Sequence, residues 1–384
     1  IHARPLDLSR PPWELYLIGG LDGIGHVPKG SMAVFLRVHH AAIDGVAGAE
    51  ILTAIHTHEP DAPPPAPAAG YEWEPDPIPS DAELLRRAAI HGMMRPAAVM
   101  SAFRNAAMQM PMLARDSRNP SFTSPASLPQ GTRFNQPVGP HRVVGTCYTT
   151  IDTLKGIRKG MPEAKINDIG VAVIGGAIRT YLLDKDELPN ESLLAMMPIS
   201  IRPTMTQKAD ASMPTGSADS KSAATAGNQF ALAPITLATD EADPFERLRR
   251  IVTSTSHVKE SGAYPVRSLM AMTEEALGGL SGTVQRTAVR ALSRRGRTLA
   301  VHTLVSNVPG PLTPMYFCGA KMVDLTGLGP VLDGMALNNG IGSYGDRVIF
   351  CFTADRDALP DPEFYEECIA GAIDDLVAAA QAQS

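Results

Sequence analysis

Two adjacent histidines, His39 and His40, are the residues of this sequence best suited to acid–base chemistry. They open the heptad His39-His40-Ala41-Ala42-Ile43-Asp44-Gly45. An imidazole ordinarily titrates near pH ~6.5, so at neutral pH it is mostly the free base. It can therefore accept a proton from an attacking hydroxyl or amine. This chemistry points to acyl transfer.

A strand followed by a helix is expected to position the histidines. Residues 33–38 read AVFLRV, a short apolar run with one charge that is typical of a half-buried strand. Gly45 then allows a sharp turn toward a helix over residues 47–56. Successive strand side chains point to opposite faces, so the two histidines cannot do the same job. We assign the general base to His40.

The other interpretations of this segment involve Asp44. We expect Asp44 to organise the turn, because Asp favours local turn hydrogen bonds and can hold a nearby arginine. A metal site would use both histidines and Asp44, but neighbouring strand histidines diverge and the sequence shows no second His/Cys cluster. Two purely structural histidines are a further alternative. The spacing of His39 and Asp44 also resembles glycerol-phosphate acyltransferases, although Gln130 replaces the acidic residue of their second motif.

Several further motifs follow one another along essentially the whole chain. In order they are PLDLSRPPWE at 5–14, the histidine heptad, ND at 167–168, PISIRP at 198–203, GN at 227–228, SNVPGP at 306–311 and GSYG at 342–345. This series resembles the bacterial wax ester synthase/diacylglycerol acyltransferase family. The histidine heptad alone would indicate only the wider superfamily of CoA-dependent acyltransferases, which includes chloramphenicol acetyltransferase and peptide-synthetase condensation domains.

The resemblance implies an α/β fold. It consists of two chloramphenicol-acetyltransferase-like domains with mixed sheets, joined by a crossover and enclosing an active-site tunnel that contains His40. Residues 1–118 would be the remainder of the N-terminal domain, 119–141 the crossover linker and 142–384 the C-terminal domain. Family members usually carry about a hundred residues before the first motif. The N-terminal domain would therefore be incomplete here, and we expect a companion N-terminal fragment to cover the apolar surface that is left exposed.

The resemblance also implies an activity. The chain would be a long-chain acyl-CoA-dependent O-acyltransferase that makes triacylglycerol, wax esters or both from diacylglycerol or a long-chain alcohol. Acyl-CoA would be a co-substrate, and no metal or bound redox cofactor is expected. Catalysis would involve His39, His40, Asp44 and Gly45. Two alternatives stay open: an enzyme of the same fold with a different acceptor, and a catalytically silent lipid-binding member.

Six more residues are candidates to bind substrate or support the site. Pro11 and Trp13 lie where family members usually read Pro-Leu-Trp, and here Pro12 replaces the leucine. Asn167 and Asp168 either begin a helix, where Asn can cap and Asp suits the positive helix end, or lie near the reacting groups. The apolar run 299–305 predicts a strand that ends in a rigid turn at 306–311, where Ser306 or Asn307 could donate to a developing oxyanion. We assign the residues 343–352 to structure, as a turn and a late strand.

Composition limits the class of protein. The chain has 384 residues, 44% hydrophobic and 19% charged, which is ordinary for a two-domain globular protein. Its net charge of −6 argues against nucleic acid as a partner. The apolar stretch 170–178 ends at Arg179, short of the ~20 residues that span a bilayer. The four dispersed cysteines predict buried free thiols in a reducing cytoplasm.

Arginine-rich helices are expected over residues 84–118, broken at Pro96 and Pro111. One interpretation is a helical layer on the core with its arginines in solvent. The other is that these helices rest on anionic lipid, at the inner membrane face or on lipid inclusions, together with a second arginine group. That group comprises Arg286, Arg290, Arg294, Arg295 and Arg297.

The remaining segments have simpler signals. Prolines over 59–80 favour an extended surface connection, and a helix should begin near Ser80, which can cap it. The next strand should start near Val143. A mobile loop is expected at 210–227, followed by a strand at 228–238 and a helix at 243–259.

Overall fold

The computed structural model describes residues 1–24, 27–40, 45–63, 77, 79–87, 89–90, 129–200, 230–261, 281–298 and 301–383. Some sequence predictions therefore lie outside the described residues. They are the position of Asp44, the arginine-rich helices beyond residue 90, the first part of the crossover, the loop predicted at 210–227 and most of the proline-rich connection.

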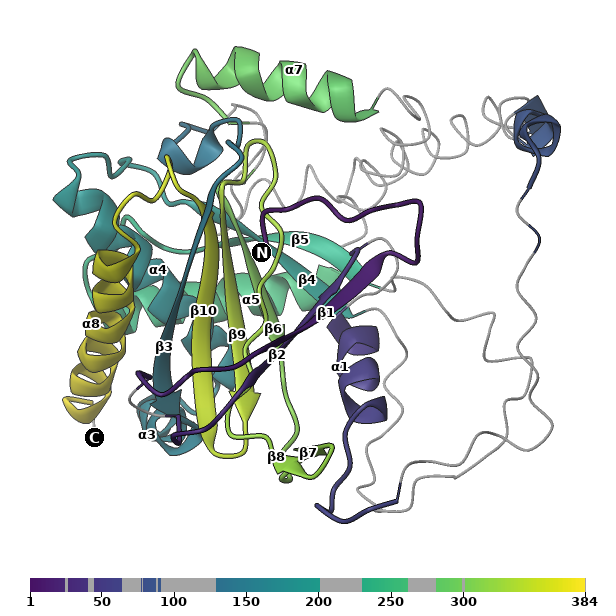
Figure 1. The fold of residues 1–384 in the computed structure, drawn as a ribbon. Coiled ribbons are helices and arrows are strands. Elements are labelled where there is room, and N and C mark those ends of the chain that lie inside the picture. The colour runs from purple at the N-terminus through teal and green to yellow at the C-terminus, as the bar shows by residue number, and fades with distance from the viewer. Residues whose placement is uncertain are drawn as a thin grey trace.

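A six-stranded mixed sheet forms the centre of the fold (Figure 1). Two parallel pairings, of β6 with β4 and with β9, interrupt an otherwise antiparallel sheet. This confirms the α/β class with a mixed sheet and the strands expected near 143, 228 and 347. The strand predicted at 299–305 is also present, but it continues to Val308, so the turn predicted to begin at Ser306 begins later. In spatial order the strands are β3 (Arg142–Thr150), β10 (Arg347–Asp355), β9 (Leu337–Tyr344), β6 (Thr303–Val308), β4 (Leu194–Ser200) and β5 (Phe230–Thr236).

A layer of helices covers one face of this sheet. The helix α4 packs against α5 and α8, and α3 packs against α8. By length and composition α4 could cross a membrane, but 72% of its apolar window is buried inside the protein, so it is a core helix. The bounds are α3 (Ile151–Gly160), α4 (Ile166–Asp184), α5 (Pro244–Ser261) and α8 (Pro362–Gln381).

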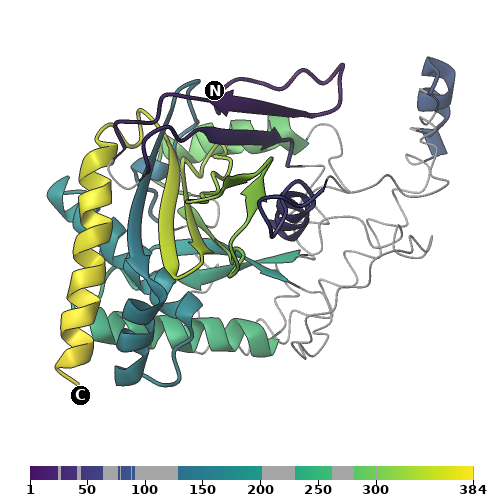
Figure 2. The same cartoon turned by 60° about the horizontal axis from the view of Figure 1, so that its bottom comes forward.

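The N-terminal part supplies a two-stranded sheet and one helix. The strand β1 (Trp13–Ile18) pairs antiparallel with β2 (Ala33–Val38), which confirms the strand predicted at 33–38. Figures 1 and 2 show this pair and α1 (Gly45–Ala54) on the side of the large sheet opposite to the helical layer. Gly45 belongs to α1 rather than to the predicted turn. A glycine destabilises a helix least in its first turn, where the backbone N–H groups have no helical partner.

Three smaller elements complete the described fold. They are a 3₁₀ turn η1 (Arg133–Asn135), the helix α7 (Ser281–Ser293) and the hairpin of β7 (Tyr316–Phe317) and β8 (Ala320–Lys321). Residues 81–87 are helical, and the Glu83 N–H donates to the Ser80 hydroxyl over 3.3 Å, which confirms the predicted cap.

The end of the predicted crossover is fixed to the C-terminal part of the chain. Asn135, 2% exposed, donates through Nδ2 to the carbonyls of Val301 (3.1 Å) and Gly334 (2.8 Å). Its Oδ1 accepts from the Thr132 N–H over 2.9 Å. One buried amide thereby satisfies backbone groups from three segments, as buried polar groups require.

The cysteines only partly match the prediction. All four are free; Cys351 and Cys368 are buried, and Cys147 is half-buried. Cys318 is exposed, so the prediction of buried thiols is wrong there. It occupies the β7–β8 turn with φ 49°, a conformation found at tight turns that point into solvent.

A buried histidine joins the crossover to two strands. The Leu194 N–H donates to Nδ1 of His302 over 3.0 Å, so the ring proton is on Nε2, which donates to the Gln130 carbonyl over 2.8 Å. His302 is 1% exposed, and burial lowers the pKa of its imidazole below the ordinary 6.5. The neutral ring is therefore the native form.

We expect His302 to make the stability pH-dependent. Because the pKa of His302 is lower in the folded chain than in the unfolded chain, its contribution to the free energy of unfolding is complete above pH ~6.5. That contribution is lost as the pH falls below this value. The loss can reach about 1.4 kcal/mol per pH unit. Urea unfolding of wild type and His302→Gln between pH 7.5 and 5.5 should show a steeper decline for wild type, and parallel declines would contradict the assignment.

Candidate functional site

The two histidines lie immediately after β2, at one end of the β1–β2 pair. The His39 N–H donates to the Pro12 carbonyl over 2.9 Å, and both imidazole side chains are exposed. Trp13, 56% exposed, lies opposite Val38 in the register. The structure thus places the predicted pocket residues, separated by more than twenty positions in the sequence, beside the histidines.

A buried arginine fixes this pair of strands. Arg37 has a side chain only 8% exposed, and its Nη1 lies 2.7 Å from Oε2 of Glu14, its cross-strand partner. The Tyr16 hydroxyl donates to the same carboxylate over 2.7 Å, and Arg37 also donates to the Arg4 carbonyl. Sequence reasoning assigned Arg37 no role. The available signal was a charged residue inside an apolar strand, which requires a partner when it is buried.

The opposite face of β1 is apolar and open. Trp13, Leu15 and Leu17 are 56%, 38% and 61% exposed. Their cross-strand neighbours on β2 are Val38, Leu36 and Val34. A continuous apolar surface therefore runs along the β1–β2 pair toward the end where His39 and His40 lie.

The helix after the histidine segment is held at its far end by the β7–β8 hairpin. Thr57 and Tyr316 exchange two backbone hydrogen bonds, each of 2.8 Å. The rings of His56 and Phe317 lie 5.5 Å apart, and Nδ1 of His56 donates to the Leu52 carbonyl over 2.7 Å. We call the Thr57–Tyr316 and His56–Phe317 contacts the hairpin clamp.

Asp168 is buried at the start of α4. It is 2% exposed, its Oδ2 accepts from the Lys165 N–H over 2.9 Å, and its Oδ1 accepts from the Thr255 hydroxyl of α5 over 2.9 Å. The predicted helix start is confirmed to within a residue. The prediction that Asn167 caps the helix is wrong, because Lys165 is the N-cap and the carboxylate three residues later bonds back to it.

Asn167 is instead paired with a residue of β6. Nδ2 of Asn307 donates to Oδ1 of Asn167 over 3.0 Å. Side chains alternate along a strand, so Asn307 shares a face with buried Val305, which packs in the core beneath the helices. Ser306 faces the other side of the sheet, where β1, β2 and α1 lie (Figures 1 and 2).

Comparison with known proteins identifies the family. Residues 1–170 match the model of the wax ester synthase/diacylglycerol acyltransferase catalytic domain, and residues 226–377 match its C-terminal domain. A Mycobacterium tuberculosis protein, named as a candidate diacylglycerol O-acyltransferase, is 30% identical over 100% of this chain and 71% of its own length. The chain belongs to the wax ester synthase/diacylglycerol acyltransferase family.

Two more relatives agree with this assignment. The O-acyltransferase WSD of Acinetobacter baylyi is 29% identical over 94% of this chain and 72% of its own length. The solved wax ester synthase/diacylglycerol acyltransferase from Marinobacter aquaeolei VT8 shares the fold, with a TM-score of 0.62 at 22% identity, over 99% of this chain and 74% of that one. The predicted family, α/β fold and acyl-CoA-dependent O-acyltransferase class are thereby confirmed.

In this acyltransferase Gly310, Ser343 and Tyr344 make structural contacts, as expected for the segment 343–352. The Gly310 N–H donates to the Ser343 hydroxyl over 3.2 Å, and a Cβ at Gly310 would lie 1.9 Å from the Ser343 carbonyl oxygen. Only glycine permits this close approach. Tyr344 accepts from the Met315 N–H over 3.2 Å and donates to the Met322 carbonyl over 2.9 Å, which fixes the segment carrying the hairpin clamp.

A cavity of about 480 Å³ lies among the described residues away from the histidines. It is lined by polar groups from the end of the predicted crossover, from the segment after α4 and from the end of β10, including Arg133, Glu187 and Asp355. The tunnel expected around His40 stays a prediction.

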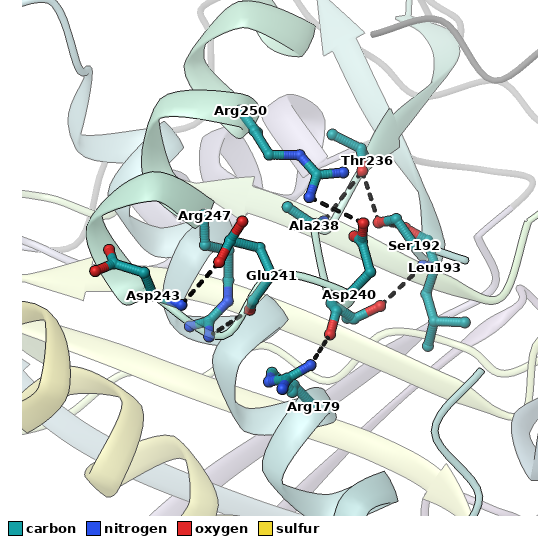
Figure 3. Close-up of polar contacts among 11 residues, drawn as sticks. Arg179, Ser192, Leu193, Thr236, Ala238, Asp240, Glu241, Asp243, Arg247 and Arg250 are labelled. Carbon is teal, nitrogen blue, oxygen red and sulfur yellow. Dashed lines mark hydrogen bonds and ion pairs between the residues drawn. The ribbon is translucent and has the colours of Figure 1, made fainter. Parts of the chain in front are cut away.

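A second polar cluster lies between α4 and α5 (Figure 3). Arg179 donates to the Thr239 carbonyl over 2.6 Å. Arg247, 4% exposed, donates to the carbonyls of Glu241 (3.0 Å) and Ala242 (3.2 Å). Because these acceptors are backbone groups of the β5–α5 loop, both arginines serve to hold that loop.

We expect the clamp to depend on the amide of Tyr316. Tyr316→Pro removes the N–H that donates to Thr57, whereas Tyr316→Phe keeps it. Loss of a bond worth about 1 kcal/mol should make the Thr57 amide exchange roughly fivefold faster with deuterium. Mass spectrometry of peptides covering 51–58 measures this, and equal exchange in the two variants would argue against the clamp.

We also expect Thr255 to support the buried carboxylate of Asp168. Thr255→Val keeps the shape but removes a donor to a buried charge, and should cost about 1.5–3 kcal/mol in the free energy of unfolding. Thr255→Ser keeps the hydroxyl and should cost less. Urea unfolding at pH 7 compares the two, and a valine variant as stable as the serine variant would contradict the role.

Proposed function

We propose that this acyltransferase transfers a long-chain acyl group from acyl-CoA to the hydroxyl of diacylglycerol or a long-chain alcohol, with His40 as general base. The observation that supports this most strongly is the position of the histidine pair at the end of β2, exposed and beside Pro12 and Trp13. A base must be reachable by the substrate from which it takes a proton.

The reaction proceeds through one tetrahedral intermediate. His40 takes the proton of the acceptor hydroxyl as its oxygen forms a bond to the thioester carbonyl carbon. The carbonyl oxygen becomes an oxyanion; when the C=O bond re-forms, the C–S bond breaks. The imidazolium then returns its proton to the CoA sulfur, so that the products are an ester and free CoA.

We assign supporting roles to residues on the histidine side of the sheet. Ser306 is the better candidate to donate to the oxyanion, because the amide of Asn307 is already bound to Asn167 on the helix side. The open face of Trp13, Leu15 and Leu17 suits an acyl or alkyl chain. Asp44 and Gly45 complete the segment between β2 and α1, with Asp44 as organiser.

The organisation proposed for the whole enzyme follows the sequence boundaries. Residues 1–118 contribute to one acyltransferase domain, 119–141 to the crossover and 142–384 to the other domain, with the reaction in a tunnel between the two. The enzyme works in the cytoplasm, at the surface of the lipid that contains its acceptor.

The test is CoA release from palmitoyl-CoA with hexadecanol or dioleoylglycerol as acceptor. His40→Ala should lower turnover by about 10²–10⁴-fold, the usual contribution of a general base. His141→Ala, which removes an exposed histidine at the start of β3, is the matched control and should keep wild-type turnover.

The outcomes separate the competing hypotheses. Acceptor-dependent release that is lost only in His40→Ala supports the mechanism and identifies the preferred acceptor. Undiminished release in His40→Ala, with folding verified by circular dichroism, overturns the base assignment. If wild type releases no CoA with either lipid acceptor, an acceptor of another kind or a silent lipid-binding protein is favoured.

A further inference from the structure

The general base and the oxyanion donor of the proposed reaction lie in separate parts of the fold. His40 follows β2, and β1 and β2 form a sheet of their own. Ser306 belongs to β6, a strand of the six-stranded sheet. Among the described residues the two sheets exchange no backbone pairing. Contacts between other elements must therefore fix the distance between the two groups.

The β7–β8 hairpin is rigidly fixed to the six-stranded sheet. Met315, which precedes β7, is 1% exposed, and its N–H donates to the Tyr344 hydroxyl of β9 over 3.2 Å. Its carbonyl accepts from the N–H of Met322, which follows β8, over 2.8 Å. The Tyr344 hydroxyl then donates to the Met322 carbonyl over 2.9 Å. Both ends of the hairpin are thus tied to β9, the strand that pairs with β6 and Ser306.

The hairpin clamp holds the far end of α1 through two backbone hydrogen bonds and one ring contact. A further hydrogen bond of 3.4 Å joins the Thr313 hydroxyl to Nδ1 of His58. His56 is itself tied to the helix, because its Nδ1 donates to the Leu52 carbonyl over 2.7 Å. A displacement of the hairpin is therefore transmitted to α1.

The near end of α1 carries the histidine segment. Four residues separate His40 from Gly45, the first residue of α1. A helix of ten residues spans about 15 Å, so a tilt imposed at its far end also moves its start. On the other side, the His39 N–H donates to the Pro12 carbonyl and ties the pair to β1. The position of the His40 imidazole therefore depends on α1 as well as on β2.

We propose that the hairpin clamp positions the His40 base against the oxyanion donor at the end of β6, with His56 and Phe317 as its positioning residues. Both side chains act through α1 rather than on the substrate. A general base must lie within hydrogen-bond reach of its proton, and a displacement of about 1 Å can cost 10²-fold in rate. The inference rests on the proposed function, because it concerns the geometry of that same reaction.

Removal of the ring contact tests the proposal through turnover. Phe317→Ala should lower kcat for CoA release about tenfold to a hundredfold. The KM for palmitoyl-CoA should stay unchanged, because the apolar surface of β1 is left in place. Phe317→Tyr keeps the ring and should keep kcat. The matched control Phe364→Ala removes a phenyl ring from α8 that lies 5.9 Å from the Tyr181 ring, and should keep wild-type kcat.

A covalent clamp separates positioning from stability. Thr57 and Tyr316 form a hydrogen-bonded antiparallel pair. The Cα atoms of such a pair lie ~5.5 Å apart, within the range that a disulfide spans. Thr57→Cys/Tyr316→Cys, added to Phe317→Ala, should recover kcat when oxidised and lose it again in dithiothreitol. These variants also carry Cys318→Ser, which removes the exposed thiol beside the new pair.

The geometry can also be measured without turnover. Spin labels on Met32→Cys and Leu183→Cys report the distance between the β1–β2 part and the helical layer, since the two positions are 56% and 52% exposed. Cys147→Ser and Cys318→Ser remove the two accessible native thiols. The distance distribution should be narrow with Phe317 present and broader in Phe317→Ala.

Four results would overturn the proposal: wild-type kcat in Phe317→Ala, an equal loss of kcat in Phe364→Ala, an oxidised disulfide variant no faster than its reduced form, or identical distance distributions with and without the ring. His40→Ala is measured in parallel. If CoA release survives in His40→Ala, the proposed function fails, and the distance distributions still decide whether the clamp sets the geometry. If release is lost in His40→Ala but not in Phe317→Ala, the clamp fails and the proposed function stands.

Discussion

A buried carboxylate in the first turn of α4 cannot be left without hydrogen bonds, and this requirement determines how three elements meet. Asp168 accepts from the backbone of Lys165 and from Thr255 of α5, so the start of α4 has a fixed place under the sheet. The next residue toward the N-terminus, Asn167, then reaches Asn307 at the end of β6. The charge thereby links the helical layer to the end of β6, where Ser306 faces the histidine side.

The local elements were largely predictable from the sequence. The apolar run at 33–38 predicted a strand with the observed bounds, and the Ser80 cap and the start of α4 were marked by residues that satisfy helix ends. Such signals are local, because the residue and the group that it satisfies lie within a few positions. The position of Gly45 was missed because glycine signals a turn and a helix start equally well.

The contacts that build the site were not predictable, because they join distant segments. Arg37 and Glu14 are 23 positions apart, and Asn167 and Asn307 are 140 apart. A single sequence contains no record of which polar groups meet across such distances. The motif order did predict the family and the fold, since both depend on the identity of segments rather than on their contacts.

The hairpin clamp has a consequence for biosynthesis. Thr57 and Tyr316 are 259 residues apart, so at ~5–20 residues per second the ribosome completes the second partner roughly 13–52 s after the first. During that time α1 has no clamp, and helices this short are marginally stable alone. The helix that follows the histidines is therefore anchored only late in translation, and a nascent chain shorter than about four-fifths of the sequence lacks that anchor.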